Sequence, residues 1–367
     1  MALRPLTLAD LRRYAVSRTL FAPTTLGRAI GKLGFVQADP IRAPARAQDL
    51  TLRHRVRNYR AGDLERRYAS LGIEEDFFVN YGFLPRATHA VMHPRTPRKA
   101  WTKASETRAN AILDFVRANG VVHPRDVDAH FQHGKTQNWF GGSSNASTQL
   151  LDGLHYRGHL RVAGRAGGVR LYAARTATPA DDDPAAAMDG LVDIIVRKYA
   201  PLPARSLSEL VYHLRIGVPQ WSDERRASLA RAALRLPHAE VDGVVWYWPQ
   251  GEDPRASRWS SGAAASPDIR LLAPFDPVVW DRRRFEILWG WKYRFEAYTP
   301  AAKRLRGYYA LPLLRADAVI GWGNLSVVDN RLRADIGYAS GAAPSGKAHK
   351  AALGEELERM RVFLGLG

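Results

Sequence analysis

The chain has 367 residues, of which 46% are hydrophobic and 25% charged, and its 54 lysines and arginines against 36 acidic residues give a formal net charge of +18. This length predicts about two to four domains, and the balance of side chains argues against global disorder. The sequence has no cysteine, which excludes disulfides, thiolate zinc sites and a cysteine nucleophile, and no apolar run long enough to span a membrane.

The positive charge is the first indication of a partner. Residues 1–60 alone contain 12 basic and three acidic residues. A basic chain attracts polyanions, so DNA or RNA is the favoured partner, with an anionic membrane surface as a weaker alternative. The first residues lack the apolar run of a secretory signal, and we expect a cytoplasmic protein of the bacterial nucleoid.

Residues 1–95 have a mostly helical pattern. Thr7 can cap a first helix whose apolar residues fall on one face. A second helix fits Thr24–Leu33, where Gly34 is placed to end it. Residues 63–71 also predict a helix, and the prolines and basic residues from Pro94 onward indicate a linker.

Residues 104–175 predict three helices followed by a β-hairpin. This order is typical of a winged helix, in which the hairpin is the wing. The predicted helices are 105–119, 124–131 and one that begins at Asn145 or Ser147, and the strands are 160–162 and 169–171. Arg161, Arg165 and Arg170 lie on this hairpin, where they would suit a wing that contacts phosphates.

The same order recurs after a polar linker at 176–186. Helices are predicted at 189–199, 206–214 and 222–234, followed by a hairpin over 239–248 that turns at Asp242-Gly243. We interpret this segment as a second winged helix. The first 95 residues could form a third, although their wing is less clear.

The last hundred residues change character. After a loop at 250–267, strand-like segments separated by turns predict a small antiparallel sheet or barrel, and 347–364 closes the chain as a helix. The strand-like segments are 269–272, 308–314, 319–328 and 332–336. The chain is therefore expected to have an α+β fold with four domains, at 1–98, 99–180, 181–262 and 263–367.

One short string stands out as a candidate site. In Gly34-Phe-Val-Gln-Ala-Asp-Pro-Ile41, Gln37 and Asp39 are two residues apart and point the same way if the segment is extended, as Pro40 favours for Asp39. The arginines that follow are expected to lower the pKa of this carboxyl. The alternative is a structural turn, in which Asp39 caps a helix or pairs with Arg42 or Arg46.

This string and three others resemble the bacterial interstrand-crosslink DNA glycosylases of the AlkZ/YcaQ group, also described as winged-helix DNA-binding proteins of the helix-turn-helix 42 family. The matching segments are 33–41, Arg46 with the 50–56 run Leu-Thr-Leu-Arg-His-Arg-Val, the 292–304 segment that ends in Lys303-Arg304, and Gly307-Tyr-Tyr-Ala-Leu-Pro-Leu-Leu314. The resemblance implies tandem winged helices and a small C-terminal β-barrel that form a cradle around duplex DNA.

The resemblance also implies a reaction and its residues. Gln37 and Asp39 match the family's catalytic Gln-x-Asp form, which favours the YcaQ-like branch over the branch with a second glutamine. The implied activity is monofunctional hydrolysis of the N-glycosidic bond of N7-alkylguanine, including the unhooking of interstrand crosslinks. Asp39 would stabilise the oxocarbenium-like sugar and activate water, and Gln37 would hold the water or the sugar–phosphate.

We expect duplex DNA with alkylated or crosslinked guanine as the partner, a monomer, and no cofactor, metal or membrane. The histidines between 123 and 159 lack the spacing of a metalloprotease motif. A non-enzymatic winged-helix regulator or nucleoid-associated DNA-binding protein is the alternative, since the positive charge and the winged-helix fold suit either function.

The predicted DNA-binding residues are Arg42, Arg46, Arg53, His54, Arg55, Arg57, Arg161, Arg165, Arg170, Lys303 and Arg304.

Overall fold

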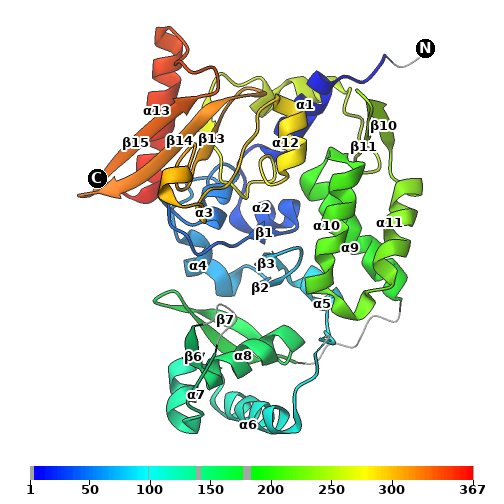
Figure 1. The fold of residues 1–367 in the computed structure, drawn as a ribbon, viewed down its shortest axis with the longest axis vertical. Coiled ribbons are helices and arrows are strands. Elements are labelled where there is room, and N and C mark those ends of the chain that lie inside the picture. Colours follow the sequence, from blue (N-terminus) through cyan, green and yellow to red (C-terminus); the bar gives the residue numbers. More distant parts are fainter. Residues whose placement is uncertain (1–3, 98, 138–141, 177–182, 367) are drawn as a thin grey trace. The chain divides into compact units, whose positions relative to one another are not determined.

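The computed structural model describes residues 4–97, 99–137, 142–176 and 183–366 of an α+β protein (Figure 1). Two compact units are formed by non-contiguous segments. The first comprises Met1–Leu64, Val192–Leu210 and Leu229–Gly367, and the second comprises Glu65–Leu191 and Val211–Ser228. No helix within the described ranges is long and apolar enough to cross a membrane.

The first unit begins with two helices, and capping residues set the start of the first and the end of the second. Thr7 and Asp10 form a reciprocal capping box at the start of α1 (Leu8–Thr19). The second helix, α2 (Leu26–Leu33), ends at Gly34 in the left-handed conformation. The two-residue strand β1 (Val36–Gln37) and the short helix α3 (Ala47–Leu52) follow. The order places the Gln37–Asp39 string directly after a helix end.

A four-stranded antiparallel sheet completes this unit. The helix α12 (Arg282–Trp289) precedes most of it, and α13 (Lys347–Leu364) packs against strands at its two edges (Figure 1). The strands run in the order β12 (Ile269–Leu271), β13 (Leu311–Arg315), β14 (Ala318–Val328) and β15 (Arg331–Tyr338). Because β12 and β15 do not pair with each other, the sheet is a curled half-barrel: the antiparallel sheet expected here is confirmed, but it does not form a complete barrel.

One apolar core joins the N-terminal helix to this sheet. Val16 of α1 and Leu20, which directly follows that helix, pack with Phe285 of α12 and with Leu314 and Val319 of the sheet. The start and the end of the chain thus share a single core, which holds the segment after α2 against C-terminal residues.

The second unit contains a hairpin that the sequence pattern did not predict. Following α4 (Asp63–Arg67), whose last residues enter this unit, and the turn η1 (Tyr68–Ser70), strands β2 (Ile73–Phe77) and β3 (Tyr81–Pro85) pair antiparallel, and α5 (Arg86–Val91) follows them. The acidic run Glu74-Glu75-Asp76 lies in β2, where all three side chains are buried. Acidic residues are poor strand formers, which explains why the pattern was missed.

The predicted helix–helix–helix–hairpin order is present in the second unit. Its elements are α6 (Lys103–Asn119), β4 (Val121–Val122), α7 (Pro124–Phe131), β5 (Lys135–Gln137), β6 (Ser143–Asn145), α8 (Ala146–Arg157), β7 (Leu160–Ala166) and β8 (Val169–Ala174). The hairpin β7–β8 and the short β4 form one sheet, which packs on the three helices around a core that includes Ile112, Val127 and Leu154.

The same order recurs in the next segment, which passes through both units. Its elements are α9 (Pro184–Tyr199), β9 (Leu202–Pro203), α10 (Ala204–Gly217), η2 (Pro219–Trp221), α11 (Glu224–Arg235), β10 (His238–Val241) and β11 (Val244–Tyr247). Asp242 and Gly243 both have positive φ, as the predicted tight turn requires. The linker expected at 176–186 is shorter at its C-terminal end because α9 begins at Pro184, and its residues 177–182 lie outside the described ranges. The four-domain division stays a prediction.

Candidate active site

Gly34 directs the chain into the segment that carries Gln37 and Asp39. Its φ is +67°, and a Cβ atom at this position would lie 2.7 Å from Cγ2 of Ile194, so a side chain would both strain the backbone and clash with α9. After this turn the chain runs through β1 into the Asp39-Pro40 corner. The glycine that ends α2 therefore also sets the path of the candidate catalytic residues.

Gln37 is held by a residue from the far end of the sequence. Its side chain is buried, with 5% of its surface exposed, and Oε1 accepts a hydrogen bond of 2.8 Å from Nε1 of Trp280. The Trp280 ring in turn lies 5.2 Å from the Tyr199 ring, centroid to centroid. With Oε1 engaged, the amide is oriented so that its NH2 group is the part left to donate to a ligand.

The side chain of Asp39 closes a short turn with the backbone two residues further on. Oδ1 accepts a hydrogen bond of 2.9 Å from the backbone N–H of Ile41, and the backbone N–H of Asp39 donates to Oε1 of Gln48 at 3.2 Å. The side chain is 8% exposed and forms no ion pair within the described part of the chain. Neither the helix cap nor the pairing with Arg42 or Arg46 considered above therefore occurs.

The pKa of Asp39 shifts opposite to the expected direction. Burial raises it, and the hydrogen bond from Ile41 only partly offsets that rise. The expectation of a lowered pKa was wrong: Arg42 is exposed to solvent, and Arg53 and Arg55 pair with other carboxylates in the unit. Perturbed pKa values cluster at functional sites, so the shift is consistent with a functional role for Asp39.

Tyr309 is a buried residue whose ionisation the sequence pattern did not connect with Asp39. Burial raises the pKa of its phenol, and the negative charge of Asp39 raises it further. The Tyr309 hydroxyl is buried and has no hydrogen-bond partner among the described residues, and its ring meets that of Phe295 edge to face at 5.2 Å. No short-range pattern could reveal Trp280 or Tyr309, because Trp280 lies 243 residues beyond Gln37.

Beneath the string lies a buried pair of charges. The Arg55 guanidinium donates to both oxygens of Asp276, at 2.7 and 3.0 Å, and neither side chain is exposed. The predicted phosphate contact of Arg55 is therefore corrected to a structural role. The ammonium of Lys198, also buried, donates to the carbonyl of Phe35; burial and the charge of Arg55 lower the pKa of this lysine to about 7.

Arg53 and His54 are likewise engaged inside the first unit. Arg53 pairs with Glu356 and its side chain is almost fully buried. One ring nitrogen of His54 lies 2.9 Å from the Leu271 carbonyl, and burial, with the charge of Arg53, holds its pKa well below the ordinary value. Both side chains therefore already have partners within the first unit, and their contact with DNA stays a prediction.

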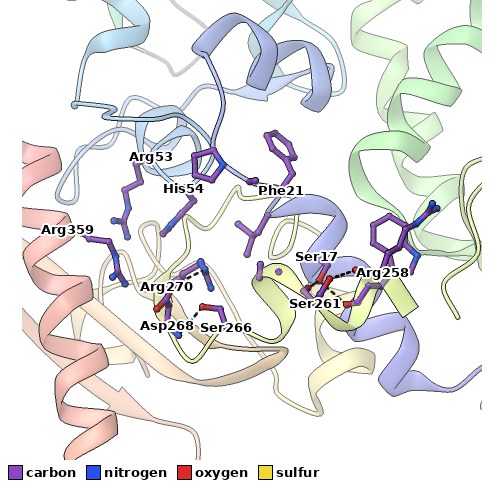
Figure 2. A pocket seen from close by; sticks show the side chains of 16 residues that line it. Ser17, Phe21, Arg53, His54, Arg258, Ser261, Ser266, Asp268, Arg270 and Arg359 are labelled. Carbon is purple, nitrogen blue, oxygen red and sulfur yellow. Dashed lines mark hydrogen bonds and ion pairs between the residues drawn. The ribbon is translucent and has the colours of Figure 1, made fainter. Parts of the chain in front are cut away.

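These two side chains line a cavity of about 550 Å³ (Figure 2). Arg270 and Arg359 also line it, and Arg270 reaches Asp268 at 3.3 Å. Figure 2 shows Arg53, His54, Arg270 and Arg359 grouped at one side of this cavity. The cavity is basic, and several of its cations are already paired: Arg270 with Asp268 in the cavity wall, and Arg53 and Arg359 with Glu356 outside it.

The other predicted DNA-binding residues differ in solvent exposure and in whether they already pair with other residues. Arg42, Arg57 and Lys303 are exposed, whereas Arg46 is half-buried. Arg304 donates to the Thr299 carbonyl at 2.8 Å. The wing residues are partly neutralised within the second unit: Arg161 pairs with Glu74, Arg165 with Glu75, and Arg170 with Asp152.

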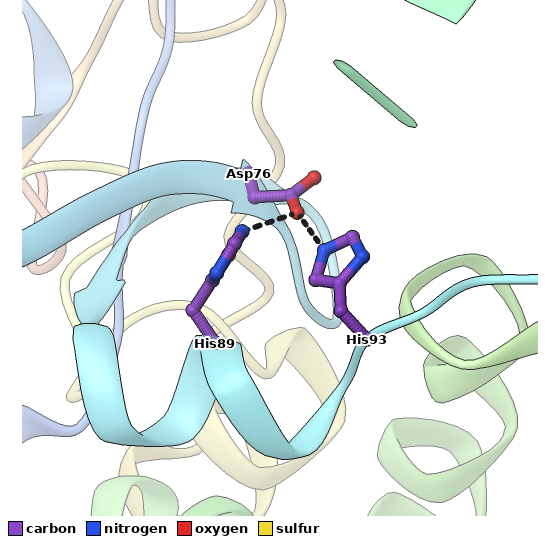
Figure 3. A group of neighbouring side chains, drawn as sticks. All are labelled: Asp76, His89 and His93. Carbon is purple, nitrogen blue, oxygen red and sulfur yellow. Dashed lines mark hydrogen bonds and ion pairs between the residues drawn. The ribbon is translucent and has the colours of Figure 1, made fainter. Parts of the chain in front are cut away.

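A cluster of Asp76, His89 and His93 in the second unit has the composition of a metal site (Figure 3). Both histidines point Nε2 at the same carboxylate oxygen, at 3.0 and 2.7 Å, which are hydrogen-bond distances. Arg95 also donates to both Asp76 oxygens, at 3.1 and 3.2 Å. Because a guanidinium already covers the carboxylate, the arrangement fits a buried hydrogen-bond hub and not a cation site.

Two comparisons place these features among known proteins. The profile of a family described as DNA glycosylase AlkZ-like matches residues 30–363, a range that contains Gln37, Asp39, Trp280 and Tyr309. The fold is similar to that of Streptomyces sahachiroi DNA glycosylase AlkZ, with a TM-score of 0.62 and 15% sequence identity, over 99% of this chain and 98% of that one. At this identity the second likeness supports the fold alone.

Proposed function

Because the chain belongs to the AlkZ-like family of DNA glycosylases, we propose that it hydrolyses the N-glycosidic bond of N7-alkylguanine in duplex DNA and unhooks interstrand crosslinks of that type. The observation that carries the proposal is the Gln37–Asp39 pair, in which an oriented amide and a buried carboxylate lie on one short segment. The Gln-x-Asp form further favours the YcaQ-like branch.

The proposed reaction needs few catalytic groups from the protein. An alkyl group at N7 makes guanine cationic and therefore a good leaving group. Breaking the bond builds positive charge on the sugar, which Asp39 would stabilise while it orients or deprotonates the attacking water. Gln37, with Oε1 held by Trp280, would offer its NH2 group to the water or to the sugar–phosphate.

The raised pKa of Asp39 is compatible with this role. Burial removes water from the carboxyl group and strengthens its interaction with a nearby positive charge. A cationic nucleotide beside Asp39 would favour the ionised form and lower the pKa again on binding. The positive charge of the substrate would thus balance the negative charge of the ionised Asp39 carboxylate.

The substrate range tests the proposal. Four duplexes would be compared under single-turnover conditions, carrying N7-methylguanine, a nitrogen-mustard crosslink between N7 atoms, uracil or 8-oxoguanine. Alkali cleavage and a denaturing gel would resolve the products. We expect base release from the first two without added cofactor, and little or none from the neutral bases, because no strong general acid accompanies Gln37.

Each other outcome has a clear meaning. Efficient uracil release would show that leaving-group charge is not what the site uses. Cleavage of the methyl adduct with complete failure on the crosslink would indicate a closed pocket. DNA binding without base release from any duplex would favour a non-enzymatic DNA-binding protein.

A further inference from the structure

The cavity of about 550 Å³ in the first unit has more cations in its wall than carboxylates. Four arginines line it, against one carboxylate, Asp268, among the described residues. A second carboxylate, Glu356 of α13, pairs with Arg53 and Arg359 from outside the lining. Arg258 forms no ion pair within the described part of the chain, and Figure 2 shows it across the cavity from the other arginines. The wall is therefore positively charged on two sides.

Two of these arginines use only one nitrogen each as a donor. Arg53 donates through Nη2, to the Leu271 carbonyl at 3.2 Å and to Glu356. Arg270 also donates through Nη2, to Asp268 at 3.3 Å. Nε of Arg53 and Nη1 of Arg270 are buried and have no partner among the described residues. Because buried donors are normally hydrogen-bonded, these two guanidinium groups have the capacity for a further acceptor.

The positive charges in the wall also act on one another. Burial, and then the charge of Arg53, hold the pKa of His54 well below its ordinary value, and Arg270 adds to the shift. Burial lowers the pKa of Arg270 itself, and the charge of Arg359 lowers it further. A negative charge among these side chains would offset their repulsion, so the acceptor that the wall favours is an anion.

The depth of the arginines limits the kind of anion that can reach them. The Arg53 side chain is 4% exposed and that of Arg270 is 18% exposed. A phosphodiester inside a duplex has a sugar on each side and cannot enter a recess, whereas a phosphate at the end of a small molecule can. Leu20, Phe21 and Trp259 also line the cavity and offer apolar surface to the rest of such a molecule. Its volume lies within the range of about 300–1,000 Å³ that is usual for small-molecule sites.

We propose that this cavity binds a small molecule with a terminal phosphate group, held by Arg53 and Arg270. The planar guanidinium group matches two phosphate oxygens with two parallel N–H donors, and each of these arginines has donors left for that purpose. Neither Gln37 nor Asp39 lines the cavity. The inference therefore goes beyond the proposed function and does not depend on it.

The choice of variants follows from a second cavity. Arg53, His54 and Arg359 also line a cavity of about 410 Å³, which Arg258 and Arg270 do not line. Arg270→Gln and Arg258→Gln would therefore test the first cavity specifically. Arg333→Gln is the matched control, because it removes the same charge from an exposed position on β15 that lines neither cavity.

The test is isothermal titration calorimetry on the full chain at constant ionic strength, with adenosine 5′-monophosphate, adenosine and inorganic phosphate as probes. We expect adenosine to bind at least about tenfold more weakly than its monophosphate, because it lacks the charged group. Arg270→Gln should weaken binding of the monophosphate about tenfold or more, and the exposed Arg258→Gln about threefold. Arg333→Gln and Asp39→Asn should leave the affinity unchanged.

The source of the phosphate is distinguished by two of the probes. Tighter binding of the monophosphate than of inorganic phosphate would show that the site takes an organic phosphate, and equal affinities would show that it takes the free ion. Equal binding of adenosine and its monophosphate would contradict the proposal, as would full affinity in a folded Arg270→Gln variant. If Arg270→Gln does not fold, as circular dichroism would show, Arg258→Gln decides.

A competition experiment separates this site from the DNA-binding surface. Undamaged duplex at a saturating concentration should leave binding of adenosine monophosphate unchanged. If the duplex displaces it and Arg270→Gln weakens duplex binding by the same factor, the cavity belongs to the DNA-binding surface and the inference is wrong. Failure of the chain to release any base would contradict the glycosylase proposal alone, since it would not alter phosphate binding.

Discussion

A carboxyl group that is almost fully buried and has a raised pKa destabilises the protein that contains it. At neutral pH the ionised form of Asp39 has lost most of its hydration, and one backbone N–H compensates for part of that loss. Residues of this kind are retained where the charge has a use. At the residue scale, Asp39 is therefore where stability and the proposed activity conflict.

Replacing Asp39 with asparagine is expected to separate the two effects. The single-turnover rate on N7-methylguanine DNA should fall about 100-fold or more, as when one electrostatic stabiliser is removed. DNA affinity should hold or rise slightly, because an anion is removed from a surface that meets phosphates. Rate measurements and anisotropy on the same duplex would test both. A variant with a near-full rate would contradict the assignment of Asp39.

The same substitution should change the dependence of stability on pH. Between the ordinary pKa of an aspartate and its raised folded value, the folded state binds more protons than the unfolded state, so this group makes stability fall as pH rises. In Asp39→Asn that contribution disappears, and the variant should be at least as stable as the parent at pH 7. Urea unfolding of both chains over a series of pH values would show this, and the activity of the parent should decline as pH falls through the folded pKa of Asp39.

At the scale of elements, the second unit is held by a buried carboxylate. Asp76 of β2 accepts hydrogen bonds from His89 of α5, from His93 and from Arg95. Burial opposes its ionisation, but the charge of Arg95 and the two histidines outweigh burial and hold the pKa of Asp76 well below its usual range. Arg95 also donates to the Gly217 carbonyl at 2.6 Å, which ties the end of α10 to the same hub.

Asp76→Asn should therefore destabilise the protein by about 3–5 kcal/mol, because it leaves a buried guanidinium without its counter-charge. Asp114→Ala is the matched control: its ion pair with Arg117 on α6 is exposed and should contribute less than about 1 kcal/mol. Urea unfolding of the full chain, monitored by circular dichroism, would compare the two. An Asp76→Asn loss no larger than that of the control would show that the hub is not structural.

At the scale of the whole molecule, several of the 54 basic side chains are already engaged by carboxylates inside the protein. Arg53 and Arg55 pair with Glu356 and Asp276, and the wing arginines pair with carboxylates of the second unit. The cations left for phosphates are the exposed ones. The number of basic residues in the sequence thus overstates how many phosphate contacts the chain can form.

Salt dependence would measure how many of these cations contact DNA. The logarithm of the binding constant should fall with that of the salt concentration by about 0.9 per neutralised phosphate. Arg42→Ala and Arg57→Ala, both at exposed positions, should each reduce that slope by about one unit on any duplex. Arg117→Ala, outside the proposed set, should leave it unchanged, and a slope near zero for the parent chain would contradict a phosphate-binding surface.

Local chemistry alone determined several features of this protein. The capping box at Thr7, the left-handed Gly34 and the Asp242-Gly243 turn depend on backbone preferences and hydrogen bonds between near neighbours, which a sequence states directly. The string that carries Gln37 and Asp39 is recognisable from the sequence for the same reason, because its residues are adjacent in the chain.

Tertiary structure decided the environment of those residues. The partner of Gln37 is Trp280 and the partner of Arg55 is Asp276, each more than 200 residues further along the chain. The charge of Asp39 likewise acts on Tyr309. Whether a charge is exposed or buried, and whether a sheet closes or stays open, depends on packing between elements distant in sequence. The pKa of Asp39 was predicted in the wrong direction for that reason: the sequence places arginines beside it, whereas the folded chain buries it apart from them.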